Sequence, residues 1–410
     1  MIPAPLAITG VGVRTAAGGL DGLWDSIQAG RHHLEALDDG ADGRPPRLVA
    51  RLDEPLEGLF PRRIDAGASR HARLGAAAMA ELLGPDGGDL AGAGLVFASA
   101  SQGQDLAERV WKRFGDYDIR SIDQDSLRSL TNSGATQIIA VRYGLGGFVQ
   151  SIDGASAAGL LALQAAAAVL RSGLSRRVFV VAGEANVFPA SLAFYEKKVL
   201  LGGVTHTFFG RWRDPEPRPL GTAIHPFGQP SESDRGAIGE AGAALCLETL
   251  EGARSRGTEV LALLDDVHTW FHADGYHGAD RELVGLARVL EPFSGSLPGS
   301  IHLPVSGAWV LDTGVIEATS RVFPGAHAFS IEPQIGHCGA ASSLLNIALA
   351  VRALQERIRL PTRGLDFGTR DPRCLLAPSG GFVPDPDLEE IVVPSCGWGG
   401  WNAAARIRRA

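Results

Sequence analysis

One short segment carries residue types that could do covalent chemistry. Residues 151–159 read Ser-Ile-Asp-Gly-Ala-Ser-Ala-Ala-Gly, the pattern of a strand, a tight turn of small residues and the start of a helix. This pattern places Ser156 at the helix N-terminus, where unpaired N–H groups and the helix dipole favour negative charge. A serine there is either a nucleophile beside a site that holds an oxyanion, or a helix N-cap that contributes about 1 kcal/mol of stability.

Alternating strands and helices must position this turn, and the apolar periodicity predicts where they lie. Strands are expected at residues 6–13, 94–98, 177–183, 243–247, 260–264, 301–305, 327–331 and 390–394. Helices are expected at residues 21–29, 69–83, 157–172, 281–290, 314–321 and 340–356, with loops at 34–68 and 201–236. Such alternation is typical of parallel sheets covered by helices. We therefore expect an α/β fold with two halves, residues 1–250 and 251–410, although no sequence repeat relates them.

Composition excludes several classes of protein. Hydrophobic residues make up 45% and charged residues 20%, as in folded globular chains. The net charge of -8 argues against nonspecific nucleic-acid binding, which needs a basic surface. No apolar run reaches the roughly 18 residues of a membrane-spanning helix, and the first residues lack the basic region of a signal peptide. The four cysteines form no CxxC pair, so we expect a cytoplasmic chain with free thiols and no metal site.

Five motifs follow one another along almost the whole chain. They lie at Ile8–Val13, Asp153–Leu163, Gly239–Glu248, Ile335–His337 and Cys396–Asn402. Their order and spacing resemble those of the β-ketoacyl-acyl-carrier-protein synthases, or ketosynthases, of the thiolase fold. The resemblance implies two pseudo-equivalent halves in five αβαβα layers, normally dimeric. It also implies an acyl carrier protein as partner, with the substrate carried on phosphopantetheine and no cofactor bound to the chain itself.

The resemblance also assigns the catalytic positions, and several have changed. In the family, a cysteine accepts the acyl chain, two histidines assist decarboxylation of a malonyl unit and a lysine organises the site. The cysteine position is Ser156, the first histidine position is Ser306 and the lysine position is Glu332. The second histidine is kept as His337. The backbone N–H groups of Ser156 and Trp398 would form the oxyanion hole.

Tryptophans occupy positions that, in the family, line the pocket for the acyl chain or its entrance. Trp398, followed by Gly399, takes the place of a phenylalanine gate. Trp401, before Asn402, takes the place of the threonine in the family's G-G-T-N motif. Together with Trp309, these rings would fill or shorten the acyl pocket, or else pack as ordinary core residues.

Three functions are therefore open. The lost catalytic groups favour a non-condensing homologue in a type II polyketide or fatty-acid-like pathway, which pairs with an active ketosynthase as chain-length-factor subunits do. The second possibility is an acyltransferase or thioesterase-like enzyme that forms an ester on Ser156, with His337 as base and Glu332 orienting the imidazole. In the bland alternative, Glu332 is a solvated loop residue. The third possibility is condensation that uses Ser156 in place of the cysteine.

A group of basic residues is the candidate for carrier-protein docking. An acidic carrier protein would be attracted to a basic rim on this otherwise acidic chain. The equally simple alternative is a solvated helix face. The residues are Arg62, Arg63, Arg70, Arg73, Lys197 and Lys198.

Overall fold

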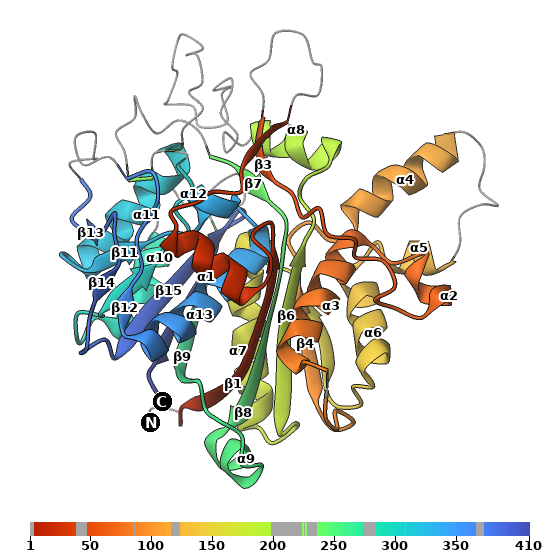
Figure 1. Cartoon of the computed structure of the whole chain (residues 1–410), viewed down its shortest axis with the longest axis horizontal. Coiled ribbons are helices and arrows are strands. Elements are labelled where there is room, and N and C mark those ends of the chain that lie inside the picture. Colours follow the sequence, from red (N-terminus) through yellow and green to blue (C-terminus); the bar gives the residue numbers. More distant parts are fainter. Residues whose placement is uncertain are drawn as a thin grey trace.

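The fold is built around one long, strongly bent sheet (Figure 1). The computed structural model describes residues 4–37, 47–85, 87–115, 124–197, 224, 226, 227, 236–273, 284–307, 309–365 and 373–410. Within these residues the main sheet has eleven strands, in the order β13-β11-β10-β15-β16-β9-β1-β8-β6-β4-β5. The strands β1 and β9 pair only over Leu6–Ile8, and this short ladder joins the two halves of the sheet.

The two halves of the sheet repeat one pattern of strand directions. The first half contains β1 (Leu6–Thr15), β8 (Ala241–Thr249), β6 (Arg177–Glu184), β4 (Gly94–Ala98) and β5 (Val149–Ile152). The second half contains β9 (Ala262–Phe271), β16 (Trp401–Arg408), β15 (Glu390–Gly397), β10 (Ser300–His302), β11 (His327–Phe329) and β13 (Ala377–Pro378). In each half two antiparallel pairings are followed by parallel ones, two in the first half and three in the second, where β13 adds a strand at the edge. The halves are thus pseudo-equivalent, as the resemblance implies, and we propose that they divide between β8 and β9.

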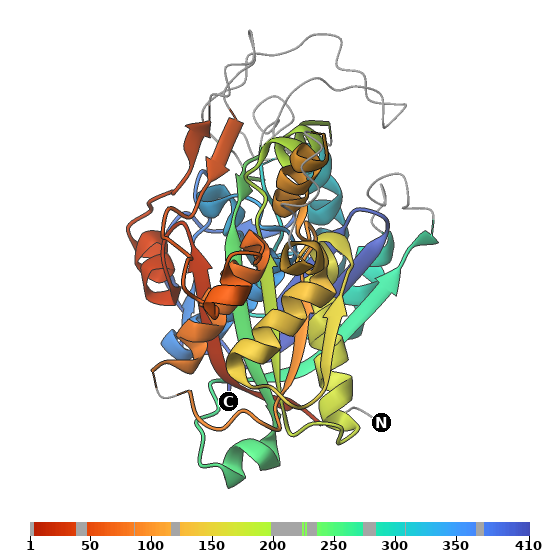
Figure 2. The same cartoon turned by 90° about the vertical axis from the view of Figure 1, so that its right-hand side faces the viewer.

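Helices complete five layers. Outside the first half lie α3 (Arg70–Leu83) and α6 (Asn132–Tyr143), which Figure 2 shows over the strands, and outside the second half lie α10 (Val284–Leu290) and α11 (Trp309–Val322). The middle layer is α7 (Ala158–Arg171) and α13 (Gly339–Glu356), which contact each other and strands of both halves. Because α13 is covered on all sides, it is buried along nearly its whole length.

The remaining elements are short or lie at the periphery. The helices are α1 (Leu20–Gln28), α2 (Arg62–Asp65), α4 (Gln104–Gly115), α5 (Gln124–Arg128), α8 (Pro189–Lys197), α9 (Leu250–Ser255) and α12 (Glu332–Ile335). Two 3-10 turns are η2 (Ala155–Ala157) and η4 (Glu291–Phe293). Small sheets are formed by β2 (Glu35–Leu37), β3 (Arg47–Ala50) and β7 (Ile238–Gly239), and by β12 (Ile358–Arg359) and β14 (Val383–Pro384).

The α/β fold expected from the sequence is confirmed, and the errors are local. The predicted strands and helices are present, with ends shifted by a few residues. The segment 34–68 was expected to be loop and instead contains β2, β3 and α2. The expectation for 201–236 falls mostly outside the described residues. The sequence analysis missed α6 because small and polar residues there replace a clear apolar stripe. No helix among the described residues is long and apolar enough to cross a membrane.

Close packing of α7 on α13 depends on a glycine. A Cβ on Gly159 would stand 2.3 Å from Ser343 Oγ and 2.4 Å from Ala340 O. Because Ala340 O belongs to the backbone of α13, it cannot move aside cheaply. We expect Gly159→Ala to lower the free energy of unfolding by about 2 kcal/mol, the usual cost of overpacking. Thermal denaturation measures the effect, and Gly295→Ala, where a Cβ meets open space, should leave the midpoint unchanged. Equal midpoints for both variants would contradict this account.

Candidate active site

The turn before α7 contains Ser156 and is strained at the residue before it. Ser156 is buried in the 3-10 turn η2, directly after Ala155, whose φ of 49° lies in the left-handed region. A residue with a Cβ costs about 1–3 kcal/mol in such a conformation, and this strain is found mostly at functional sites. The N-cap alternative for Ser156 is wrong. Ala157 is the N-cap of α7, and the Ser156 hydroxyl has a different partner.

That partner is the imidazole of His337, from the other half of the chain. Ser156 Oγ lies 2.8 Å from His337 Nε2, across 181 residues of sequence. His337 Nδ1 lies 2.8 Å from Glu332 Oε1. All three side chains are buried. The structure therefore brings together the serine, histidine and glutamate that the sequence analysis considered as a triad, and Glu332 is no solvated loop residue.

The glutamate sets the tautomer of the imidazole. A carboxylate oxygen accepts a hydrogen bond, so His337 Nδ1 carries the proton and donates it to Glu332. His337 Nε2 is then free to accept a hydrogen bond from the Ser156 hydroxyl. Burial by itself lowers the pKa of His337, but the charge and hydrogen bond of Glu332, with smaller contributions from Glu184 and Asp312, raise it above its ordinary value. The arrangement is that of a nucleophile, a general base and an orienting carboxylate.

Equivalent positions in the two halves explain why these residues meet. Ser156 precedes α7, which follows β5, and His337 precedes α13, which follows β11. Since α7 and α13 pack together in the middle layer, the loops at their N-termini meet. The backbone of His337 is held by β7, with N–H donation to Ala237 O at 2.7 Å and acceptance from Gly239 N–H at 3.0 Å. His337 is therefore fixed through its main chain as well as its ring.

Two further side chains complete the surroundings of the triad. The ring of Tyr195 meets the His337 ring edge to face, with the centroids 6.2 Å apart. Burial, together with the neighbouring Glu184, raises the pKa of the Tyr195 hydroxyl. Ser395 Oγ donates to Ser156 O at 3.0 Å and ties β15 to the nucleophile turn. The sequence analysis missed both residues, because Tyr195 lies in the unassigned helix α8 and Ser395 in a strand chosen only for its apolar pattern.

Ser306, a predicted catalytic residue, is buried and is held by the carboxyl group of Asp312. Its N–H and its hydroxyl donate to Asp312 Oδ1 at 3.0 and 3.2 Å, and Gly307 N–H donates to Asp312 Oδ2 at 2.6 Å. Burial raises the pKa of Asp312 to about 7, despite these hydrogen bonds. Asp312 in turn acts electrostatically on His337. The catalytic role expected for Ser306 stays a prediction.

The loop between β15 and β16 lies against the nucleophile turn. A Cβ on Gly397 would stand 2.7 Å from Gly154 O, so the next residue, Trp398, begins beside the turn. Trp398 is half-buried, and Gly399 has a φ of 92°. This placement is compatible with the oxyanion hole expected from the N–H groups of Ser156 and Trp398, which stays a prediction.

Of the expected pocket residues Trp309, Trp401 and Asn402, the last two have contacts that can be named. Trp401 packs edge to face on Phe271, with centroids 4.8 Å apart. Asn402 is buried, and its Nδ2 donates to Gly400 O at 3.0 Å. These contacts hold the β15–β16 loop in place. Trp309 is the first residue of α11, and its side chain lies outside the described part of the structure.

The candidate docking residues that the structure describes differ in their surroundings, and carrier docking stays a prediction. Arg70 bonds to Glu240 and to Leu52 O, and Arg73 bonds to Asp65 and to Leu56 O. Arg62 and Arg63 are exposed on α2. Lys197 ends α8 and its side chain is outside the described residues, as is the whole of Lys198.

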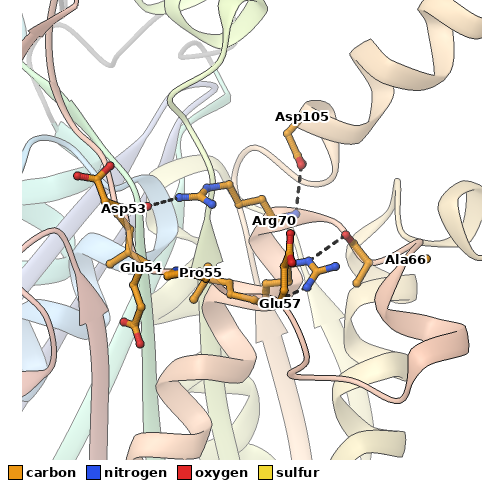
Figure 3. Close-up of a pocket in the computed structure, with 11 residues that line it drawn as sticks. Asp53, Glu54, Pro55, Glu57, Ala66, Arg70 and Asp105 are labelled. Atoms are coloured by element: carbon orange, nitrogen blue, oxygen red, sulfur yellow. Dashed lines mark hydrogen bonds between the residues drawn. The ribbon is translucent and has the colours of Figure 1, made fainter.

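A cavity of about 420 Å³ lies beside Arg70 and Arg73 (Figure 3). It is lined by residues Leu52, Asp53, Glu54, Pro55, Leu56, Glu57, Ala66, Ala68, Arg70, Arg73 and Asp105. Asp105 accepts a hydrogen bond from Arg70 N–H at 3.1 Å. Since acidic side chains surround it and no triad residue lines it, this cavity supports neither carrier docking nor the chemistry of Ser156.

Other chemistry finds little support in the described residues. The four cysteines are free, as expected. Cys338 follows His337, but burial raises the pKa of its thiol well above the ordinary value, which disfavours it as a nucleophile. In the described part of the chain, no three His, Cys, Asp or Glu side chains are grouped so as to hold a metal ion.

Comparison with known proteins gives consistent similarities. Residues 4–207 match the family model of the β-ketoacyl synthase N-terminal domain. A protein of Streptomyces cyaneus named as a polyketide β-ketoacyl synthase 1 is 25% identical, over 98% of this chain and 97% of its own length.

Two solved structures share the fold over nearly the full length of both chains. One contains a type II polyketide synthase acyl-carrier protein in complex with its ketosynthase, with a TM-score of 0.81, 20% identity and 100% of each chain covered. The other is the ishigamide ketosynthase/chain length factor, with a TM-score of 0.81, 17% identity and 99% of each chain covered. At these identities the similarity shows the thiolase-like fold alone.

Proposed function

The chain belongs to the β-ketoacyl synthase family, and we propose that it transfers or hydrolyses acyl groups through an ester on Ser156. One observation carries this proposal: Ser156 Oγ, the His337 imidazole and the Glu332 carboxylate form a continuous chain of hydrogen bonds, 2.8 Å at each link. A serine hydroxyl is a weak nucleophile until a base removes its proton. The two hydrogen bonds of His337 support it as that base.

The reaction needs only an acyl thioester and an acceptor. Ser156 Oγ attacks the thioester carbonyl while His337 Nε2 takes the hydroxyl proton. The new C–O bond forms, the C–S bond breaks, and the proton passes from His337 to the departing thiol. An alcohol, amine, thiol or water then repeats the sequence in reverse, with His337 again as base, and frees Ser156.

The changed positions argue against condensation as the main activity. In the family two histidines assist decarboxylation and a lysine organises the site, and the first histidine and the lysine are here replaced by Ser306 and Glu332. Losing a catalytic group lowers a rate by orders of magnitude, and here two are missing. The retained histidine has instead been given a carboxylate partner.

We further propose that the substrate is carried on the phosphopantetheine of an acyl carrier protein in a cytoplasmic polyketide-type pathway. Two observations support this part. The relative from Streptomyces cyaneus is named for polyketide synthesis. A structure with the same fold holds an acyl-carrier protein with its ketosynthase.

Intact mass spectrometry tests the proposal. The purified chain is incubated with acetyl-, hexanoyl- and benzoyl-pantetheine and with the same groups on a carrier protein. We expect the mass to rise by one acyl group, with the adduct mapped to the peptide that contains Ser156. Resistance of the adduct to neutral hydroxylamine distinguishes an oxygen ester from a thioester on a cysteine. No adduct with any donor, or an adduct on Cys338, would refute the proposal.

A second candidate is a partner subunit that shapes the site of an active ketosynthase. It is favoured by the likeness to a ketosynthase/chain length factor structure and by the edge strand β5. Among the described residues this strand has one neighbour in the sheet, and Val149 on it is 38% exposed. An unpaired strand edge can pair with a second chain. Co-expression with a cysteine-bearing ketosynthase tests it: a stable one-to-one complex supports the partner role, and a homodimer alone opposes it.

A further inference from the structure

Acidic side chains surround the base on several sides. Glu332 of α12 bonds to the His337 ring at 2.8 Å. Glu184, at the end of β6, accepts from Ala340 N–H at 3.4 Å, and its carboxyl carbon lies 2.8 Å from where a Cβ on Gly339 would stand. Asp312 of α11 holds the Ser306 loop. These three carboxyl groups are at most 3% exposed, so water screens their charges poorly.

The charged groups that act on His337 in the described part of the chain are all acidic. They are Glu332, Glu184 and Asp312, and the other titratable neighbours are the Tyr195 phenol and the Cys338 thiol. Oε2 of Glu332 is buried and has no hydrogen-bond partner among the described residues. A negatively charged group brought beside Ser156 and His337 would therefore meet buried acidic side chains, and none of the described groups named as acting on His337 is a cation.

We infer that this site accepts uncharged acyl donors and rejects donors whose acyl group carries a carboxylate near the thioester, such as malonyl and succinyl groups. This inference rests on the proposed acyl transfer through Ser156 and adds the charge class of the substrate. Like charges in a poorly screened site repel strongly. The same three carboxyl groups leave a neutral alkyl, aryl or amide-bearing acyl group unaffected.

The discrimination should depend on pH in a defined direction. Burial raises the pKa of Asp312 to about 7, and burial also raises the pKa of Glu184. Below its pKa a carboxyl group is neutral and repels nothing, and above it the group is negative. As the pH rises through about 7, Asp312 gains its charge, so rejection of an anionic donor should become stronger.

Two acyl donors of nearly equal shape separate the effect of charge on the acylation rate from the effect of size. Succinyl-pantetheine ends in a carboxylate, and succinamyl-pantetheine ends in a neutral amide of almost the same size. Intact mass spectrometry follows the rate at which each acylates the whole chain at pH 6 and pH 8, with butyryl-pantetheine as the neutral reference. We expect succinamyl to acylate at least about 100-fold faster than succinyl at pH 8, and the ratio to shrink at pH 6.

Two variants test whether the named carboxylates cause the effect. Asp312→Asn and, independently, Glu184→Gln should each lower the succinamyl-to-succinyl ratio at pH 8 by several-fold; the second guards against a folding defect in the first. Equal rates for succinyl and succinamyl on the unmodified chain would overturn the inference while the butyryl ester still supports acyl transfer. No acylation by butyryl or succinamyl would instead overturn the proposed function, and the inference with it.

Discussion

Replacing Ser156 by alanine is expected to abolish covalent acylation, with at least about a 1,000-fold loss of any turnover. The hydroxyl is the one group in the arrangement that forms the new bond, and His337 has no other nucleophile placed at Nε2 by the described contacts. The fold should persist, because the contact that ties the turn to β15 uses Ser156 O, a backbone atom. Intact mass of the wild type and Ser156→Ala, incubated side by side with hexanoyl-pantetheine, measures the difference.

Ser156→Cys is the matched control for that loss. A thiol is far easier to ionise than a hydroxyl, so this variant should still be acylated, now as a thioester that neutral hydroxylamine cleaves. An adduct of equal size on Ser156→Ala would show that the acyl group lies elsewhere. If Ser156→Cys forms no adduct and keeps its melting midpoint, the site does not transfer acyl groups to the side chain at position 156.

Glu332→Gln is expected to slow acylation by about 1,000- to 10,000-fold, the scale seen when a triad carboxylate becomes an amide. A glutamine can donate its N–H to His337 Nδ1, which favours the tautomer with the proton on Nε2. Nε2 could then no longer accept the proton of Ser156. A carboxylate at this position cannot donate, and this is the physical reason for the large effect.

The pH profile separates orientation from a general loss of structure. His337 acts as a base when neutral, and its pKa is raised above the ordinary value chiefly by the neighbouring Glu332, against the opposing effect of burial. Acylation by the wild type should therefore rise with pH through an inflection above 6.5. In Glu332→Gln the residual rate should rise through an inflection at lower pH. A lower rate with an unmoved inflection would mean that Glu332 supports the fold and does not tune the base.

The sequence alone determined the fold class, and its resemblance to the ketosynthases named three candidates for the site. The alternation of apolar runs predicts an α/β fold because strands and helices bury different periodicities. The resemblance to the ketosynthases assigns Ser156, His337 and Glu332 to catalytic positions of the family. The changes of residue type there predict that the condensing activity is lost. These conclusions depend on local pattern and side-chain chemistry, which a sequence displays directly.

Only the tertiary structure decided whether those residues act together. Ser156 and His337 are 181 positions apart, and their distance depends on how closely α7 and α13 pack, which in turn depends on Gly159. The ion pair between Arg70 and Glu240 is equally invisible in sequence. The acidic surroundings of His337 come from β6, α11 and α12 together. Charge, burial and hydrogen-bond distance are properties of this packing, because they depend on groups that the chain brings together from distant segments.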